Sequence, residues 1–200
     1  MQILVLYYSR HGSVANMAEK IAQGIEKAGC EAVLRTVPSL NQQELNQKEL
    51  AQGDIAYVSA DDLKNCQGLA LGSPARFGNM AAPMKQFWET TSTEWLCGDL
   101  IDKPASVFTS TSSMHGGNES TLLTMMLPLL HHGMMIQGLP YSEPSLNATT
   151  QGGTPYGASH VAGMKNNSTL SADEQALCIA QGYRLAQTAK KLTDTTNSYT

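Results

Sequence analysis

The sequence predicts a doubly wound α/β domain, in which helices cover both faces of a five-stranded parallel sheet. Short runs of β-favouring residues alternate along the 200-residue chain with segments whose apolar residues recur at helical spacing. The first run, residues 3–8, is continuous rather than alternating, which is typical of a strand buried on both faces of a parallel sheet. The length suits a single domain.

The first 37 residues predict a strand–helix–strand unit. The strand over residues 3–8 leads through a polar turn into a helix, whose apolar residues from Val14 to Ile25 recur at helical spacing. Gly29 has the position of a helix-ending glycine, and a second strand follows at about residues 31–37. A crossover of this kind between parallel strands is nearly always right-handed.

Three more strands and three more helices are expected after this unit. The last helix begins at a capping box, because Ser171 precedes it and Glu174 follows three residues later. The expected strands cover residues 68–72, 105–109 and 134–136, and the expected helices cover 80–90, 119–130 and 172–192. The side chains expected to pack inward from the first two of these helices are Met84, Phe87, Trp88, Leu122, Leu123, Met126 and Leu129.

Two polar stretches are expected to be insertions in one domain that covers residues 1–192, with a tail at 193–200. The first, at about 38–67, holds a candidate helix over Gln43–Gln52, and Ala60–Leu63 resembles the start of another. The second, at about 138–170, is rich in Gly, Pro, Ser and Asn and predicts irregular structure. A loop of this length in a compact domain is usually functional or tied to another chain.

The charge of the chain excludes several classes of function. Thirteen Lys and Arg against 17 Asp and Glu give a net charge of −4, which argues against a nucleic-acid-binding protein. No apolar run is long enough to insert into a membrane, and the N-terminus has no signal-peptide pattern, so a cytoplasmic location is expected. Charged residues make up only 15% of the chain, against about 25% in a typical domain.

The cysteines and histidines do not predict a metal site. The four cysteines have wide spacings and include no Cys-x-x-Cys pair, so we expect reduced thiols that are mostly buried. No carboxylate stands at metal-ligand spacing from the histidine pair His131–His132.

Three loops with unusual compositions follow the first, third and fourth predicted strands, where ligands of doubly wound sheets bind. The first loop, residues 9–14, combines two hydroxyls and a glycine at the start of a helix, which suits a phosphomonoester. It matches neither a nucleoside-triphosphate loop nor a dinucleotide fingerprint, and an ordinary N-cap turn is the alternative.

The second and third loops offer room for a planar ligand. Glycines and Pro74 shape the loop at residues 72–79, which presents Arg76 and Phe77 outward; an exposed turn is the alternative. The loop at residues 110–118 is almost entirely small, polar or flexible, and a mobile surface loop is the alternative there. His131 is expected near the same edge of the sheet. The alternative is that it only interacts favourably with the helix dipole, as histidines at the C-terminal end of a helix often do.

At these loops the chain resembles the WrbA-type NAD(P)H:quinone oxidoreductases. The resemblance covers residues 3 to about 163, and its most distinctive block is Gly152–Ala158. The other matching blocks are Leu4–Ser9, Gly72–Pro74, Arg76–Met80, Ala105–Phe108 and His131–Met134. It implies a flavodoxin-like fold with strand order 2-1-3-4-5, bound FMN, and assembly into homodimers or homotetramers.

The resemblance also implies roles for individual residues. His11 stands where the family has a tyrosine that contacts NAD, and Trp95 stands where it has a tryptophan that walls the nicotinamide and quinone site; a core tryptophan is the alternative for Trp95. His131 matches a histidine that reaches the pocket from a neighbouring subunit. The residues implied to bind FMN are Ser9, Arg10, His11, Gly12, Ser13, Val14, Ala75, Arg76, Phe77, Ser110, Thr111, Ser112, Ser113, Gly116 and His131.

The implied activity is the two-electron reduction of quinones by NAD(P)H through bound FMN in ping-pong order, with His11, His131 or water as the proton donor. A flavodoxin-like electron carrier and a non-catalytic FMN-binding interaction module are the alternatives. Three departures from the family are His11 for tyrosine, Ala75 for threonine, and one extra residue near Met114–His115. The low charge fits an oligomer, because surfaces buried between subunits are depleted in charge.

Overall fold

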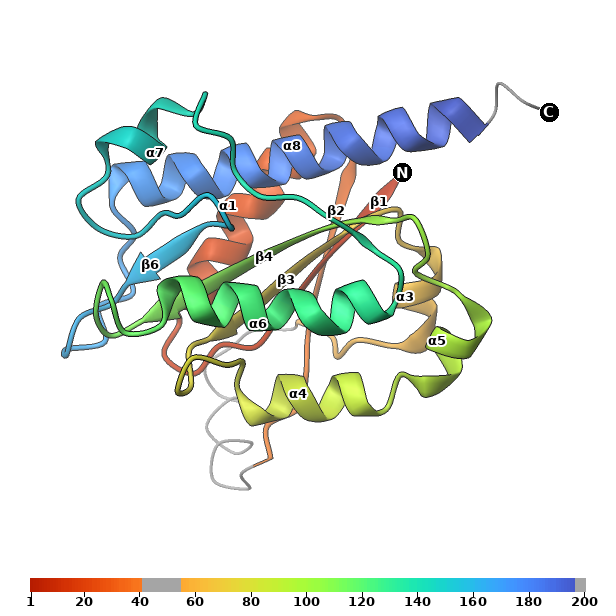
Figure 1. The fold of residues 1–200 in the computed structure, drawn as a ribbon, viewed down its shortest axis with the longest axis horizontal. Helices are drawn as coiled ribbons and strands as arrows, with labels where there is room; N and C mark the ends of the chain where they lie inside the picture. The colour runs from red at the N-terminus through yellow and green to blue at the C-terminus, as the bar shows by residue number, and fades with distance from the viewer. Residues whose placement is uncertain (41–54, 197–200) are drawn as a thin grey trace.

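A parallel sheet with helices on both faces forms the protein in the computed structural model, which describes residues 1–40 and 55–196 (Figure 1). Five of its strands form a continuous series of hydrogen-bonded neighbours in the order β2-β1-β3-β4-β5, as predicted. The strands are β1 (Gln2–Tyr7), β2 (Glu31–Thr36), β3 (Leu69–Pro74), β4 (Pro104–Thr111), β5 (Met135–Ile136) and β6 (Ser159–Val161).

The sixth strand, β6, was not predicted. β5 pairs with the start of β4 at Pro104 and Ala105, and β6 pairs with the end of the same strand at Thr109–Thr111. β6 has only three residues, which is too short for a strand pattern to show in the sequence. The stretch 138–170, expected to be irregular, therefore extends the sheet beside the carboxyl end of β4.

The helices form two layers, and each has its own core. The strand residues alternate between the layers: Ile3 and Val5 pack with α1 and α8, whereas Leu4 and Leu6 pack with α3, α4 and α6. The described helices are α1 (Ser13–Lys27), α3 (Ala60–Asn65), α4 (Ala82–Glu89), α5 (Ser92–Cys97), α6 (Asn118–His131), α7 (Pro144–Ala148) and α8 (Ala172–Thr196).

Helices α1 and α8 lie side by side on one face of the sheet (Figure 1). They approach closely because glycines stand at the crossing. A Cβ atom on Gly182 would lie 2.0 Å from the carbonyl oxygen of Ile21, and one on Gly24 would lie 2.1 Å from that of Ile179. Because these neighbours are backbone atoms, neither position accepts a side chain without moving a helix.

Several predicted boundaries differ from the structure. The short helices α5 and α7 were not predicted, and α8 continues past residue 192 into the expected tail. The helix α3 begins where Ala60–Leu63 suggested, at a capping box between Ser59 and Asp62. The candidate helix over Gln43–Gln52 lies outside the described residues.

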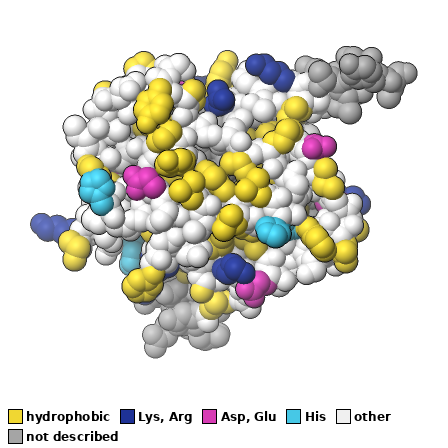
Figure 2. All heavy atoms as spheres, viewed as in Figure 1, with side chains coloured by type: hydrophobic (Ala, Val, Ile, Leu, Met, Phe, Trp, Pro, Cys, Tyr) yellow, Lys and Arg dark blue, Asp and Glu magenta, His cyan; other side chains and the backbone are white. Residues whose placement is uncertain are grey.

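Helix α6 is apolar on two sides, and the set of residues predicted to pack inward from it is only partly correct. Leu122 and Leu129 are fully buried, but Leu123 is 43% exposed and Met125 takes the inward position. Leu123, Leu127 and Leu130 instead form an outward stripe, defined here as the α6 stripe. Figure 2 shows hydrophobic side chains gathered on this face, with few charged ones among them.

The cysteines are free thiols, and Cys30, Cys66 and Cys178 are buried whereas Cys97 is exposed. Burial raises the pKa of the Cys66 thiol and that of the Cys178 thiol. These two thiols are therefore poor nucleophiles. Within the described parts of the chain, no group of three metal-ligating side chains occurs, and no helix combines the length and apolarity needed to cross a membrane.

Candidate functional site

One cleft lies at the carboxyl ends of β1, β3 and β4, where the three unusual loops meet. Hydroxyl groups, backbone and basic side chains line it, and no residue of its described lining carries a carboxylate. The lining residues are Ser9, Arg10, His11, Ser13, Val14, Pro74, Ala75, Arg76, Ser110, Thr111, Ser112, Ala162 and Asn166. The structure therefore brings together ten of the fifteen residues predicted to bind FMN.

The loop after β1 delivers the start of α1 to the cleft. Gly12 caps the helix in a left-handed conformation with φ of 91°, and no side chain caps the helix there. A residue with a Cβ atom disfavours this conformation, which explains the glycine. The first N–H groups of a helix have no partner within the helix, so α1 offers donors beside the hydroxyl of Ser13. This donor set without an acid fits a phosphate.

The loop after β3 ends in a tight turn over residues 76–79. The backbone N–H of Arg76 donates to the carbonyl of Asn79 (2.8 Å), and the N–H of Asn79 donates to that of Arg76 (3.0 Å). Phe77 has a positive φ of 51°, and its side chain is fully exposed and does not line the cleft. Arg76 does line the cleft, and its guanidinium donates to the carbonyl of Ala75 (2.8 Å).

The loop after β4 is ordered by Asn118 at the start of α6. The hydroxyl of Thr111 lies 2.8 Å from Asn118 Oδ1, and Asn118 Nδ2 donates to the carbonyl of Met114 (2.9 Å). The helix begins at Gly117, whose φ is 105° and which no side chain caps. Ser112 lines the cleft, but Ser113 and Gly116 lie on the exposed part of the loop outside it.

Residues 162–167 form a fourth wall of the cleft, which was not predicted from the sequence. Ala162 and Asn166 line the cleft. The segment is held in place because the N–H of Ala162 donates to the carbonyl of Thr111 (2.8 Å), and Asn16 Nδ2 of α1 donates to the carbonyl of Ser168 (2.8 Å). The length of the loop indicated a functional role, but nothing in its pattern pointed to these two residues.

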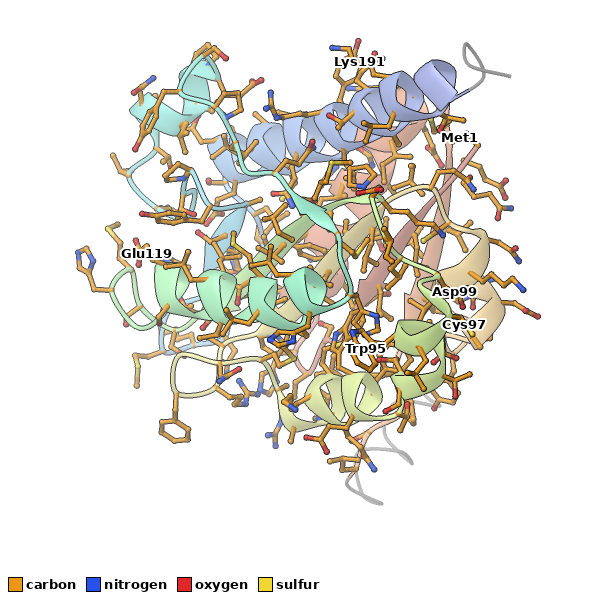
Figure 3. The ribbon with its side chains drawn as sticks, turned by 45° about the vertical axis from the view of Figure 1, so that its right-hand side comes forward. Met1, Trp95, Cys97, Asp99, Glu119 and Lys191 are labelled. Atoms are coloured by element: carbon orange, nitrogen blue, oxygen red, sulfur yellow. The ribbon has the colours of Figure 1, made fainter. Side chains whose placement is uncertain are left out.

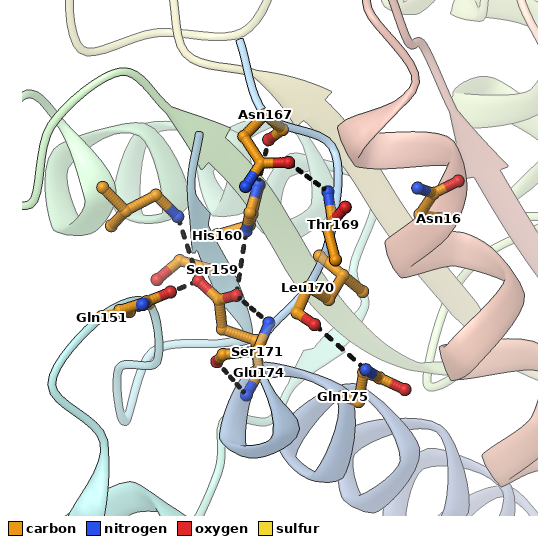
Figure 4. A network of polar contacts seen from close by, with 12 residues as sticks. Asn16, Gln151, Ser159, His160, Asn167, Thr169, Leu170, Ser171, Glu174 and Gln175 are labelled. Carbon is orange, nitrogen blue, oxygen red and sulfur yellow. Dashed lines mark hydrogen bonds and ion pairs between the residues drawn. The ribbon is translucent and has the colours of Figure 1, made fainter. Parts of the chain in front are cut away.

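A buried pair of charged groups, His160 and Glu174, supports this wall (Figure 4). Glu174 is fully buried, and its carboxylate accepts hydrogen bonds from His160 Nδ1 (3.0 Å) and from the N–H groups of Gly152 (3.0 Å), Val161 (3.1 Å) and Ser171 (2.8 Å). The predicted capping box is part of this network, because the Ser171 hydroxyl accepts from the N–H of Glu174 (3.2 Å).

The partners of His160 indicate that it is an imidazolium. Its Nε2 donates to the carbonyl of Asn167 (2.8 Å) while Nδ1 donates to Glu174, and both partners are pure acceptors. Burial alone would lower the pKa of His160, but these hydrogen bonds and the nearby carboxylate outweigh it and raise the pKa. Burial likewise opposes the charge of Glu174, yet its hydrogen bonds hold its pKa below the ordinary value.

His131 and Trp95 lie far from the cleft within one chain, so the expectation that His131 lies near the same edge of the sheet is wrong. The contact from a neighbouring subunit that the resemblance implies for His131 stays a prediction. His131 ends α6, whereas Asn118 at the start of α6 faces the cleft loop, and the 14-residue helix spans about 20 Å. Figure 3 places Trp95 and Glu119 at opposite ends of α6. Trp95 Nε1 donates to the carbonyl of His131 (2.8 Å), and the 52% exposed Trp95 side chain is not part of the core.

Comparisons with known proteins agree on one family. A family model described as NADPH-dependent FMN reductase matches residues 1–143. A protein named NAD(P)H dehydrogenase (quinone) from Syntrophobacter fumaroxidans is 42% identical, and the match covers 96% of this chain and 99% of that protein. A protein of the same name from Geobacter sulfurreducens is 41% identical, with the same two coverages.

Solved structures share the fold. A WrbA-like flavodoxin from Agrobacterium tumefaciens superposes with a TM-score of 0.66 at 22% identity, and the match covers 95% of this chain and 98% of that one. A flavodoxin from the domain Archaea gives a TM-score of 0.62 at 19% identity, covering 95% of this chain and 99% of that one. The architecture is therefore flavodoxin-like.

Proposed function

The chain belongs to the NADPH-dependent FMN reductase family, and from this membership we propose that it is an FMN-dependent NAD(P)H:quinone oxidoreductase. The observation that carries the proposal is the cleft at the start of α1, in which hydroxyls, helix N–H groups and basic side chains converge and no acidic side chain occurs among the described lining residues. The near-full-length relatives named NAD(P)H dehydrogenase (quinone) support the choice of donor and acceptor.

The residues of the cleft have separate tasks in this proposal. The loop at residues 9–14 holds the FMN phosphate through α1 N–H groups and the hydroxyl of Ser13. Residues 75–76 and 110–112 flank the isoalloxazine ring, and Asn166 adds a polar contact that the sequence did not suggest. Bound FMN would supply hydride transfer between NAD(P)H and a quinone, and these residues would bind and orient it.

Reduction of a quinone by hydride also needs a proton, which a side chain at the rim supplies in this proposal. His11 is exposed at the mouth of the cleft, on the same loop as the phosphate-binding residues. It is our first candidate for the proton donor in its own chain, because histidine is the side chain that most often acts as a general acid or base in enzymes. His131 would need a neighbouring subunit to reach the cleft.

Self-association as a homodimer or homotetramer is the second part of the proposal. The α6 stripe exposes Leu123, Leu127 and Leu130 on a helix that is already apolar toward the sheet, and such stripes mark interfaces. Trp95 and His131 stand at the end of the same helix. Contact through this face would bring both side chains toward a partner's cleft, where the family resemblance places them.

Replacing Leu127 with aspartate is expected to convert the oligomer to a monomer, because the α6 stripe would bury an unpaired carboxylate. Sedimentation velocity gives the molecular mass of each form. Tyr183→Asp is the control, since Tyr183 is 46% exposed on α8, on the other side of the sheet. An unchanged mass for Leu127→Asp would place the interface elsewhere.

The activity is tested by flavin absorbance together with NADPH and NADH oxidation in the presence of benzoquinone. We expect a yellow protein that oxidises NADPH or NADH and reduces benzoquinone with ping-pong kinetics. Bound FMN without turnover would identify an electron carrier, and absence of FMN would identify an interaction module.

We further propose a cytoplasmic location, which the four free thiols support and cell fractionation tests.

A further inference from the structure

The side chain of His160 joins the core of the protein to the fourth wall of the cleft (Figure 4). It is 1% exposed and lies between the start of α8 and the wall at residues 162–167. Its Nδ1 atom donates to the Glu174 carboxylate of α8, and its Nε2 atom donates to the carbonyl of Asn167 in the wall. One buried ring therefore ties the wall to a core helix.

The residue that His160 holds in the wall determines the turn that carries Asn166. Asn167 is fixed at both of its backbone groups, because its N–H donates to the carbonyl of Ala162 (2.8 Å) and its carbonyl accepts from His160. Within this turn Asn166 has a positive φ of 52°. A side-chain-bearing residue keeps such a conformation only where its surroundings impose it. The hydrogen bond from His160 thus helps to keep Asn166 at the cleft.

The wall also lies against the loop assigned to the FMN phosphate. Ser168 directly follows the wall, and its carbonyl accepts from Asn16 Nδ2 of α1 (2.8 Å). A Cβ atom built on Gly12 would lie 3.7 Å from the Cβ atom of Ser168, which is ordinary van der Waals contact. A displacement of the wall would therefore open the cleft beside the start of α1 as well as withdraw Asn166.

His160 can hold both partners only while it is protonated. A neutral imidazole has a single N–H group, and the partner that is the stronger acceptor keeps it. The Glu174 carboxylate would keep the proton on Nδ1, and the proton of Nε2 would be released to water. The lone pair of Nε2 would then face the carbonyl oxygen of Asn167, so the hydrogen bond to the wall would be replaced by repulsion between two acceptors.

Few charged groups compete for control of His160. Among the described residues, Glu174 alone acts on the pKa of His160 through its charge, and β4, which pairs with β6, has no titratable side chain. On α8, burial and the charge of Glu174 raise the pKa of Cys178, so this thiol is neutral. Helix α1 packs against β6 and contributes Lys20, which acts on Cys178, and the wall itself carries the exposed Lys165.

We propose that His160 is a positioning residue for FMN, because its imidazolium holds the fourth wall, and with it the side chain of Asn166, against the cleft. The inference rests on the proposed FMN site and adds that FMN binding and protonation of His160 strengthen each other. Such coupling is reciprocal. Protonation should therefore raise the affinity for FMN, and bound FMN should make His160 harder to deprotonate.

The first test is a double-mutant cycle on the affinity for FMN, measured at pH 7 by titration of the flavin-free protein and flavin fluorescence. His160→Gln has one NH₂ group, which cannot reach two acceptors on opposite sides, and should weaken binding about three- to tenfold, as for one hydrogen bond. Asn166→Gly removes the side chain and still adopts the positive φ. The double variant should lose little more than Asn166→Gly alone, whereas additive losses would overturn the proposal.

The second test is the pH profile of the same affinity, which a purely structural role of His160 would not change. The wild type should bind FMN more weakly as the pH rises from 7 to 9 and His160 loses its second proton, while a phosphate with a second pKa of about 6 stays doubly charged. The ratio of the wild-type affinity to that of His160→Gln should shrink over this range. A constant ratio would overturn the proposal.

His115→Gln is the matched control, because His115 is exposed on the loop after β4 and does not line the cleft. It should keep the wild-type affinity and pH profile. If His160→Gln does not fold, Asn166→Gly takes its place in the pH test: a weaker pH dependence than in the wild type supports the proposal, and an equal one overturns it.

These measurements need no turnover, so they separate the inference from the proposed function. A protein that binds FMN through His160 but reduces no quinone would contradict the proposed activity and support the positioning role. An active enzyme whose FMN affinity is unchanged by His160→Gln would support the activity and overturn the positioning role. A wild-type protein that binds no FMN would contradict both.

Discussion

Replacing Ser13 with glutamate is expected to release FMN from the protein and leave the fold intact. Ser13 is the first residue of α1, nearly buried, and it lines the cleft at the uncapped start of the helix. A carboxylate there would occupy the helix N–H groups and repel the phosphate. The affinity for FMN should fall by about 100-fold or more, which corresponds to roughly 3 kcal/mol.

The fold should tolerate this substitution because a negative charge at the start of a helix is favourable by about 0.3–1 kcal/mol. Loss of flavin absorbance, with an unchanged far-ultraviolet circular dichroism spectrum and the thermal midpoint of the flavin-free wild type, is therefore the expected result. Titration of the flavin-free protein with FMN, followed by flavin fluorescence, gives the affinity.

Two controls separate charge at the phosphate from other effects. Ser13→Ala removes one hydroxyl and should weaken FMN binding only about fivefold, as for one hydrogen bond. Gln23→Glu makes the same charge change on the exposed side of α1 and should have no effect. Retention of wild-type FMN affinity by Ser13→Glu would remove the loop at residues 9–14 from the phosphate site.

The sequence predicted the sheet and three walls of the cleft because those features are local. The strands at residues 3–8 and 68–72 are continuous apolar runs, and the loops after them carry hydroxyls, glycines and basic groups at the carboxyl ends of strands. In a parallel sheet these ends meet at one edge, so strand prediction alone brought together segments more than 60 residues apart.

The features that were missed depend on contacts between distant segments. β6 has three residues and exists because it pairs with the end of β4, and Asn166 reaches the cleft only through that pairing. Leu122 and Leu123 are adjacent apolar residues on a helix with two apolar sides, so helical periodicity could not decide which faces the sheet. His131 was misplaced because the direction of α6 puts its last residue at the opposite edge.

Removing the Glu174 side chain is expected to destabilise the protein by about 3–5 kcal/mol, because His160 would lose the carboxylate that pairs with it in the buried network. Three backbone N–H groups, those of Gly152, Val161 and Ser171, would also lose their acceptor. Urea unfolding of Glu174→Ala measures the loss. Asp173→Ala is the control: it removes a neighbouring acid from the same first turn of α8 and should cost at most about 1 kcal/mol.

The dependence of stability on pH distinguishes a charged pair from neutral packing. The pKa of Glu174 is lowered by folding, so its contribution is present above the ordinary value of 4.5 and is lost as the pH falls through the folded value. The pKa of His160 is raised, so its contribution is present below 6.5 and is lost as the pH rises through the folded value. The pair should therefore stabilise the protein most between these two ordinary values.

The isosteric variant Glu174→Gln tests this reasoning. Its amide oxygen still accepts from two N–H groups, but its NH₂ group now faces His160 and the N–H of Ser171. His160 can respond by giving up its Nδ1 proton and accepting from that NH₂ group. The difference in unfolding free energy between wild type and Glu174→Gln should then be larger at pH 6 than at pH 9, because only the wild type loses its imidazolium pair as the pH rises. An equal difference at both pH values would show that His160 is neutral in the folded protein, and that Glu174 supports the fourth wall through hydrogen bonds alone.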